Sequence, residues 1–294
     1  MPWAVFTLIA AAAQTARNAM QRELTATLGT VGATHVRFLF GFPFALLFLT
    51  GVTIALGESL PRPPPAFWPW VLAGAFTQIA ATATMLSVMG QRSFVVSYAF
   101  IKTEPVHVAL FGLIFLGDRV TVLSAAAVLI ATAGVIVISL KPGAAQTSTW
   151  RSTIVGLCSG ALFALSAITY RGAILTLHLP DFVLTATFTV SVGLVIQAAV
   201  LSLYLWLRDR KVLSDIMRAW KPSLFAGFMG AFASEFWFLG FAIASAANVR
   251  TLALVEVLFA QGVTHFVFKQ PTSAREGAGV VLVVIGVALL VWAY

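Results

Sequence analysis

Long apolar runs alternate with short polar, proline-rich or glycine-rich breaks along the whole chain. Ten such runs occur, and each has roughly the 20 apolar residues that a helix needs to cross a bilayer. The breaks contain residues that end helices, as in the Pro-Arg-Pro-Pro-Pro segment at 61–65 and at Gly117. The ten predicted spans are Trp3–Gln21, Val31–Leu56, Phe67–Met89, Ser93–Leu116, Thr121–Leu140, Ser152–Leu175, Phe182–Leu207, Pro222–Ala244, Val249–Phe268 and Ala274–Ala293. The pattern therefore predicts an all-α integral membrane protein with ten transmembrane helices.

The composition of the chain excludes several other classes of protein. Hydrophobic residues make up 60% of the 294 residues and charged residues 10%, with a mean hydropathy of +0.97. A soluble domain has about 25% charged residues, and ten spans leave roughly 90 residues for all the loops, so a soluble catalytic domain is excluded. The single cysteine, Cys158, and the lack of a Gly-Lys dipeptide argue against a cysteine-ligated metal and a nucleotide loop. We therefore expect no catalytic residues, no metal and no cofactor.

Lysine and arginine residues are divided unequally between the two sides of the predicted bundle. The net charge of +8 comes from loops, which favours membrane orientation over nucleic-acid binding as its cause. Eleven basic residues follow odd-numbered spans: Arg22, Arg92, Lys141, Arg151, Arg208, Arg210, Lys211, Arg218, Lys221, Lys269 and Arg275. Four follow even-numbered spans: Arg62, Arg119, Arg171 and Arg250. Because basic loops stay in the cytoplasm, this count predicts cytoplasmic odd loops and periplasmic termini.

The two halves of the sequence repeat each other weakly. The segment at 66–74 aligns with that at 219–227 at an offset of 153 residues. At an offset of 152 residues, Glu104 aligns with Glu256, and Gly134 with Gly286 in the fifth span of each half. A glutamate inside the membrane that recurs at one offset indicates an internal repeat.

This repeat sets the predicted domain organisation. We divide the chain into a first five-span repeat at 1–140, a linker loop at 141–151 and a second five-span repeat at 152–294. An odd number of spans inserts the two halves in opposite senses. Inverted repeats of this kind build secondary transporters, whose substrate site lies near the midplane between the halves.

One stretch of the first half resembles a known family. Residues 105–134, which run from Pro-Val through Phe-Leu-Gly-Asp-Arg-Val-Thr to Gly134, are similar to the fourth and fifth spans of EamA-type transporters of the drug/metabolite superfamily. That family has ten spans in two five-span repeats and an arginine early in the second span, like Arg37. This chain departs from the pattern at Asp118, where a glutamate is usual, and at 269–271, where Lys-Gln-Pro replaces Gly-Glu-Arg. Within the superfamily, the chain resembles the YddG-type exporters of aromatic amino acids.

Ionisable residues inside predicted spans are the first candidates for a transport site, since each is costly to insert into a bilayer. The four that lie farthest from predicted span ends are Lys102, Glu104, Glu235 and Glu256. Arg17, Arg37, Glu23 and His35 lie nearer the predicted cytoplasmic ends. For Arg17 and Arg37 the alternative to a direct role is that they anchor the spans and pair with Glu23.

The fourth span carries two of these candidates. Lys102 and Glu104 are two residues apart, which is about 200° around a helix, so they are not expected to share a face. Pro105 removes a backbone hydrogen bond and frees the carbonyl of Ile101, which is tolerated where other polar groups or a cavity satisfy it. Two roles stay open for Lys102, namely contact with substrate and a structural ion pair with a glutamate of another span.

Polar and aromatic residues complete the candidate site. Glu235 and Trp237 in the eighth span are expected to point in nearly opposite directions, and Phe100 shares a helix face with Glu104. Gln78 and Tyr98 carry polar atoms that need partners in mid-membrane. The candidate substrate-binding residues are Gln78, Tyr98, Phe100, Lys102, Glu104, Glu235, Trp237 and Glu256, in a pocket lined by the third, fourth, eighth and ninth spans.

These features together favour a secondary transporter of a small amphipathic metabolite in the bacterial inner membrane. The resemblance alone implies that it exports this metabolite. An aromatic amino acid is the first candidate, with Lys102 receiving its carboxylate and a glutamate its ammonium group. Glu104 and Glu256 are either proton carriers or simply hydrogen-bonded across a helix interface. The alternatives are an integral membrane enzyme, for which the sequence shows no catalytic cluster, and a channel. Besides substrate, lipid and protons, no nucleic-acid partner is expected, and both a monomer and a dimer remain open.

Overall fold

The computed structural model describes residues 1–89, 94–139, 150–259, 261 and 273–293, and side chains are described except at 89, 94–97 and 152. Within these residues every regular element is helical. The elements are α1 (Pro2–Leu39), α2 (Phe42–Leu56), α3 (Phe67–Met89), α4 (Phe94–Ile101), α5 (Glu104–Phe111), η1 (Gly112–Leu116), α6 (Val122–Ser139), α8 (Trp150–Thr176), α9 (Phe182–Arg208), α10 (Arg210–Arg218), α11 (Trp220–Ile243), α12 (Ala246–Leu252), η2 (Ala253–Val255) and α14 (Ala274–Ala293). In this part of the chain, 8 stretches are long and apolar enough to cross a membrane.

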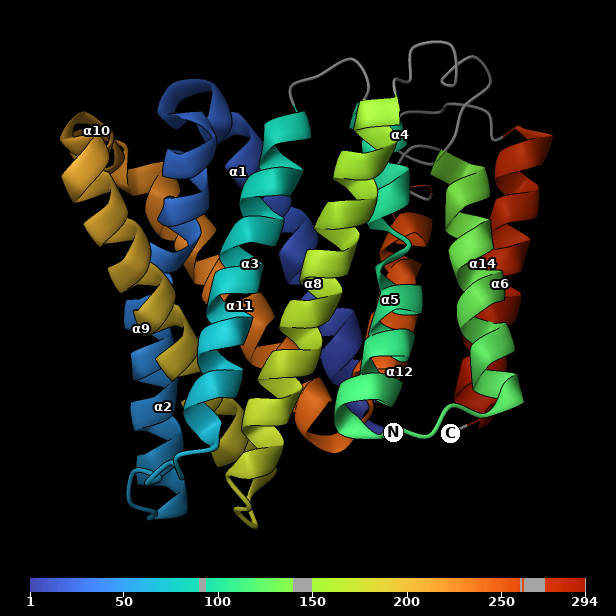
Figure 1. Ribbon diagram of the computed structural model, residues 1–294, viewed down its shortest axis with the longest axis horizontal. Helices are drawn as coiled ribbons and strands as arrows, with labels where there is room; N and C mark the ends of the chain where they lie inside the picture. Colours follow the sequence, from blue (N-terminus) through green and yellow to red (C-terminus); the bar gives the residue numbers. More distant parts are fainter. Residues whose placement is uncertain (90–93, 140–149, 260, 262–272, 294) are drawn as a thin grey trace.

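The first of these stretches, Pro2–Leu56, contains two predicted spans. Its helix is interrupted at Gly29, which has φ 68° and ψ 177°, a conformation that glycine adopts without strain. Figure 1 shows α1 rising from the N-terminus and turning back, so that α2 ends on the side where α1 began. The first span therefore continues past Gln21 to this turn, and its predicted end was wrong. Neither proline nor glycine occurs between Gln21 and Gly29 to stop the helix earlier.

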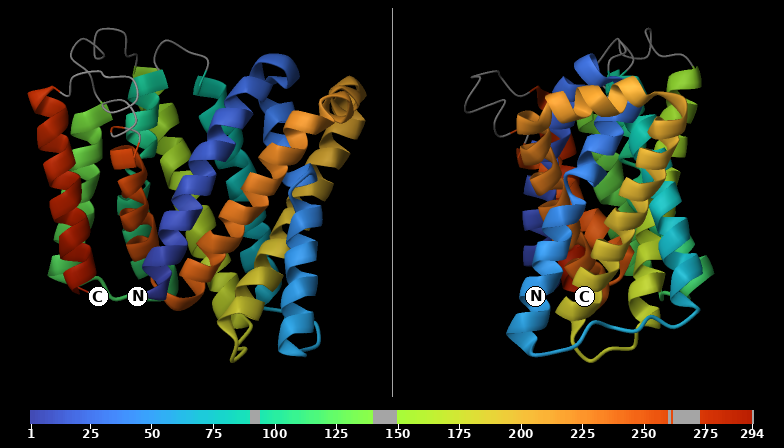
Figure 2. Two further views of the ribbon diagram at one scale, coloured as in Figure 1. Left: turned by 180° about the vertical axis from the view of Figure 1, so that it is seen from behind. Right: turned by 90° about the vertical axis from the view of Figure 1, so that its left-hand side faces the viewer.

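The segment between α9 and α11 is also helical, although the sequence analysis treats Arg208–Lys221 as a loop. Helix α10 begins after Asp209, whose carboxylate accepts a hydrogen bond from the backbone N–H of Val212. Ile216 of this helix is fully buried and packs near Gly32 of α1. Helix α10 lies across the end of the bundle opposite the N-terminus (Figure 2). The apolar residues of this short helix therefore cover one edge of this end of the bundle, where α10 contacts α1 and α9.

The ninth predicted span is described only in its first part. Helix α12 begins at Ala246, three residues before the predicted start, and passes into the short 3₁₀ segment η2. Residues 260 and 262–272, which include the predicted end of this span and its break at Lys269, lie outside the described residues.

The contacts between helices follow a two-fold pattern. Helix α1 packs against α11, and α8 packs against α3, so that the first helix of each half lies on the third helix of the other. Helices α2 and α9 pair with each other, as do α5 with α12 and α6 with α14, the last pair standing at one edge of the bundle in Figure 1. An exchange of the two halves leaves this set of contacts unchanged.

Small residues allow the closest of these approaches. A Cβ atom on Gly134 would lie 2.7 Å from the carbonyl oxygen of Gly279, and one on Gly286 would lie 2.5 Å from the backbone nitrogen of Ala131. Membrane helices pack closely where small residues let their backbones approach. The two glycines that align in the repeat thus both lie in the contact between α6 and α14.

Candidate functional site

Two broken helices meet near the centre of the bundle. The fourth span stops at Ile101 and resumes at Glu104 as α5, with Pro105 in its first turn. The ninth span changes from α12 to η2 before Glu256, and α12 packs against α5. Interrupted helices within a membrane protein occur where the backbone lines a cavity or is buried in protein. This crossing is therefore the first place to look for a substrate site.

Two ion pairs join the halves at these breaks. Lys102 pairs with Glu256, and the Nε atom of Arg250 lies 3.1 Å from the Oε1 atom of Glu104. The exposed fractions of the side chains are 12% and 6% in the first pair and 8% and 14% in the second. Of the two roles left open for Lys102, the ion pair with a glutamate of another span is the one that the structure contains. The two glutamates face cations of the opposite half.

The break in the fourth span also corrects the expectation that Lys102 and Glu104 cannot share a face. Both residues line one small pocket, because the chain between them is not an α-helix and the spacing of 100° per residue does not apply. Residues of α1, α3, α4, α5, α8 and α12 surround this pocket: Gln14, Arg17, Asn18, Met85, Tyr98, Ile101, Lys102, Glu104, Phe163 and Arg250. Helices α1 and α8 are thus part of a wall that was predicted to come from four other spans. The cavity volume of about 20 Å³ has room for about one water molecule.

Arg17 and Arg37 are buried inside the bundle, which overturns the alternative that they anchor the ends of their spans. Each is 2% exposed. Arg17 donates to the side-chain oxygen of Asn18 at 2.8 Å, and Arg37 donates to the hydroxyls of Thr82 and Ser234 at 3.3 and 3.4 Å. Because the first span extends to Gly29, Arg17 lies twelve residues, or about 18 Å, from the turn rather than at a helix end.

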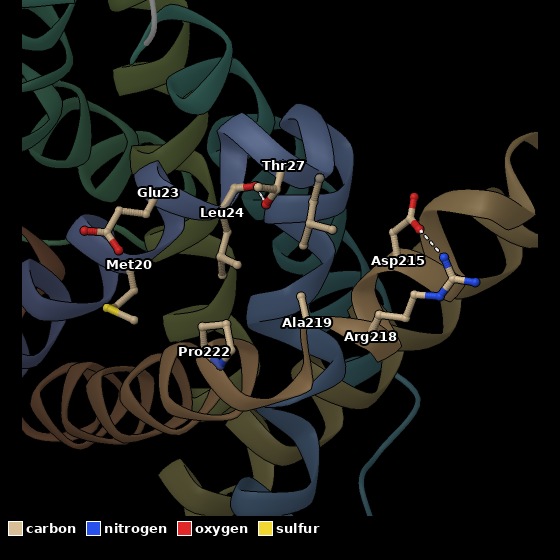
Figure 3. A pocket seen from close by; sticks show the side chains of 9 residues that line it. Met20, Glu23, Leu24, Thr27, Asp215, Arg218, Ala219 and Pro222 are labelled. Carbon is tan, nitrogen blue, oxygen red and sulfur yellow. Dashed lines mark hydrogen bonds and ion pairs between the residues drawn. The ribbon is translucent and has the colours of Figure 1, made fainter.

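The pairing of these arginines with Glu23 is also wrong. Glu23 is exposed and lines a different pocket, near the end of the bundle. Figure 3 shows this second pocket between the last turns of the first span and the segment from α10 to α11. Its volume is about 560 Å³, and Asp215 and Arg218 form an exposed ion pair of 3.7 Å on its rim. The larger pocket is therefore a surface depression separate from the buried charges.

Arg250 is a site residue that the sequence analysis counted among the loop charges, although it is the second residue of the predicted ninth span. Its guanidinium carbon lies 4.3 Å from the centre of the Trp237 ring, a cation–π contact, and it also pairs with Glu104. The Trp237 indole N–H donates to the side-chain oxygen of Gln14 at 3.2 Å. Ser245, whose hydroxyl accepts from the backbone N–H of Asn248, marks the true start of the helix. This capping signal places Arg250 inside the helix.

The remaining candidates lie outside the pocket wall. Glu235 accepts a hydrogen bond from the hydroxyl of Thr187 on α9, whereas Trp237 bonds to Gln14 on α1. The two side chains therefore point to different sides of α11, as the sequence predicts. Gln78 accepts from the side-chain amide of Gln197 at 2.8 Å. Phe100 is half-buried, and its carbonyl accepts from the hydroxyl of Thr103. The pocket thus brings together Tyr98, Lys102 and Glu104, with Glu256 and Trp237 behind it, and leaves Gln78, Phe100 and Glu235 apart.

Tyr98 contributes an aromatic face to the same pocket. The Lys102 ammonium nitrogen lies 5.0 Å from the centre of the Tyr98 ring. Together with Trp237 under Arg250, this gives each buried ion pair an aromatic neighbour. A pocket with fixed charges and aromatic faces can bind a small molecule that has both a charged group and an apolar body.

Comparisons with known proteins address the fold and the family. The model of the EamA-like transporter family matches residues 1–140 and again 150–292. No curated protein matches the chain in sequence. A crystal structure of another protein superposes with a TM-score of 0.71 over 99% of this chain and 96% of that chain, at 14% identity, which shows a shared fold. Two matches to one family model, in halves that enter the membrane in opposite senses, imply an inverted repeat in a multi-pass membrane transporter. The chain belongs to the EamA-like transporter family.

Proposed function

We propose that this chain is a secondary transporter that works by alternating access between two inverted five-helix halves. The halves are 1–140 and 152–294, joined by the loop at 141–151, with ten transmembrane helices in all. The observation that carries the proposal is the pair of buried ion pairs, Lys102–Glu256 and Arg250–Glu104, at the breaks of the fourth and ninth spans. The two-fold pattern of helix contacts supports it, because each half is built to move against an equivalent partner.

The pocket between the halves is closed in this conformation. A cavity of about 20 Å³ is far smaller than the roughly 300 Å³ or more of a typical ligand pocket. Binding of a metabolite therefore requires the halves to separate around the two ion pairs. Opening breaks these ion pairs, which costs free energy. A charged substrate offsets part of this cost, because it forms new contacts with the separated charges. Such a coupling between substrate binding and opening is what a carrier needs and a channel does not.

We propose a small amphipathic metabolite as the substrate, with an aromatic amino acid as the first candidate. Tyr98 and Trp237 offer aromatic faces, and the basic residues of the pocket offer partners for a carboxylate. The resemblance to YddG-type exporters supports outward transport across the bacterial inner membrane. An integral membrane enzyme and a channel are the competing functions.

Counterflow in proteoliposomes separates these three functions. Vesicles loaded with unlabelled phenylalanine or tryptophan are diluted into a trace of the labelled compound, with empty vesicles as the control. We expect labelled amino acid to accumulate transiently above its outside concentration, because a carrier exchanges one molecule for another. Equilibration without accumulation indicates a channel, and chemical conversion of the labelled compound indicates an enzyme. Either result contradicts the proposal.

The orientation gives a second prediction. Glu58, between α2 and α3, and Lys211, on α10, are exposed at opposite ends of the bundle. In a Cys158→Ala background, we expect a membrane-impermeant thiol reagent to label Glu58→Cys in intact cells but Lys211→Cys only after lysis. This follows from the excess of basic residues on the side of α10. The reverse labelling pattern would place the termini in the cytoplasm.

Coupling to protons gives a third prediction. When the ion pairs open, Glu104 and Glu256 lose their cations and can bind a proton. Binding on one side of the membrane and release on the other would couple transport to the pH gradient. Glu104→Gln and Glu256→Gln keep the side-chain shape and remove titration. Each variant leaves a buried cation without its carboxylate, so we expect slower uptake. We expect the remaining uptake of at least one variant to be the same with and without an imposed pH gradient, whereas uptake by the wild type responds to the gradient. Uptake into vesicles measures this. If the wild type ignores the gradient and both variants are active, the glutamates have only a structural role.

A further inference from the structure

Two buried arginines near the pocket have no acidic partner. The chain has ten acidic residues, and all of them lie in the described part: Glu23, Glu58, Glu104, Asp118, Asp181, Asp209, Asp215, Glu235, Glu256 and Glu276. The four ion pairs found among the described residues involve other bases, namely Lys102, Arg171, Arg218 and Arg250. Arg17 and Arg37 are therefore held by neutral groups alone.

The guanidinium groups of these arginines are incompletely bonded. The Nε and Nη1 atoms of Arg17 and the Nε atom of Arg37 are buried and donate no hydrogen bond to any residue that the structure describes. The two bonds that Arg37 does donate are long, at 3.3 and 3.4 Å. A buried cation without a counter-charge is unfavourable. Arg17 is also repelled by Arg37 and Arg250.

The side chains of Arg17 and Arg37 lie close to each other, beside Gly230 of α11. Arg17 lines the pocket at the crossing of the fourth and ninth spans. A Cβ atom on Gly230 of α11 would lie 3.0 Å from Cγ of Arg37 and 3.5 Å from Cδ of Arg17. The missing side chain at Gly230 thus leaves room for both stems. Around this place lie four cations, Arg17, Arg37, Lys102 and Arg250, and the two carboxylates of Glu104 and Glu256. The third buried carboxylate, that of Glu235, is bonded to Thr187 of α9 instead.

We propose that Arg17 and Arg37 form the binding site for the anionic group of the substrate, and that the site binds organic anions without an ammonium group more tightly than it binds the corresponding amino acids. This inference rests on the proposed function and names the substrate class of that site. Guanidinium groups match the planar fork of a carboxylate. In the closed conformation both pocket carboxylates bind Lys102 and Arg250. Even when these pairs open, the cations around the pocket outnumber its two carboxylates, which favours a substrate with net negative charge. The carboxylate of an aromatic amino acid fits this site, and the corresponding 2-oxo acid fits it better.

Binding to the purified full-length protein tests the substrate class. The probes are phenylpyruvate, phenylalanine and phenethylamine, which share one ring and carry a net negative, zero and positive charge, with succinate and phosphate as further anions. Ligands that bind the folded state raise the melting temperature, Tm. We expect phenylpyruvate to raise Tm more than phenylalanine at equal concentration, and phenethylamine to have no effect. An equal or larger shift with phenylalanine, or no shift with any of the three anions, would overturn the proposal.

Substitution of Arg17 separates a binding role from a structural one. We expect Arg17→Met to raise Tm in the absence of ligand, because it removes an unpaired buried charge, and to weaken the binding of phenylpyruvate at least tenfold. Arg17→Lys keeps the charge but not the planar fork, so it should retain the wild-type Tm and lose most of the binding. Arg218→Met on the exposed rim of the other pocket is the control, with both quantities unchanged. A lower Tm in Arg17→Met with unchanged binding would make Arg17 structural.

Failure of the anion site and failure of the transport cycle give different results. If phenylpyruvate binds through Arg17 but labelled phenylpyruvate is not exchanged in counterflow, the anion site stands and the transport cycle is wrong. If phenylalanine is exchanged and phenylpyruvate neither binds nor exchanges, the transporter stands and the anion site is wrong.

Discussion

Lys102→Met lowers the free energy of unfolding by about 3–5 kcal/mol and abolishes substrate exchange, because it leaves Glu256 unpaired inside the bundle. Methionine keeps the length of the side chain and removes its charge. The change is measured as Tm in detergent and as counterflow in proteoliposomes. Arg218→Gln is the matched control, since its ion pair with Asp215 is exposed and should leave Tm unchanged.

A second substitution shows whether the unpaired charge is the cause. Lys102→Met combined with Glu256→Gln leaves no isolated charge, so we expect most of the lost stability to return while counterflow stays absent. A stable and fully active Lys102→Met protein would remove the ion pair from the account. A stable but inactive one would mean that Lys102 serves the substrate and that its pairing with Glu256 adds little stability.

Gly286→Ala destabilises the contact between α6 and α14 by about 1–3 kcal/mol through overpacking. The new Cβ atom would meet the backbone nitrogen of Ala131 at 2.5 Å and its Cα at 2.8 Å, and a backbone cannot move aside as a flexible side chain does. Gly277→Ala on the same helix is the control, because a Cβ atom there has nothing within 4 Å and alanine favours the helix. Tm measures both variants. An equal Tm in the two would mean that α14 does not depend on this close approach.

The apolar pattern predicts most of the fold because breaks in it coincide with helix ends. The bounds of α3 and α14 match the predicted spans Phe67–Met89 and Ala274–Ala293, each preceded by a polar or proline-containing segment. The first span was predicted too short because its last turns contain Arg22 and Glu23. Charged residues lower the hydropathy without stopping a helix, which here continues to Gly29.

Short amphipathic elements were harder to predict. The basic segment that contains α10 was taken as a loop on its charge alone, although Val212, Leu213 and Ile216 have helical spacing. The apolar side chains of α10 can be buried because Gly32 of α1 has no side chain in the space that they occupy. The sequence of α10 alone does not reveal this contact.

The candidate site could be predicted in part. Lys102, Glu104 and Glu256 were found because ionisable residues are rare in mid-membrane. Their partners could not be assigned, because pairing depends on which helices cross. Arg17, Arg37 and Arg250 were given minor roles or loop positions, since errors of a few residues in span ends move a charge from the core to the surface.

Access to the pocket from each side of the membrane tests alternating access most directly. Met85 lines the pocket and is 4% exposed in the closed conformation. In a Cys158→Ala background, Met85→Cys is treated with an impermeant thiol reagent in right-side-out and inside-out vesicles, with and without substrate on the opposite side. We predict labelling from both sides, with each rate changed by substrate on the other side, because the pocket opens to one side at a time. Labelling from only one side, or from both sides at rates that ignore substrate, would contradict the account.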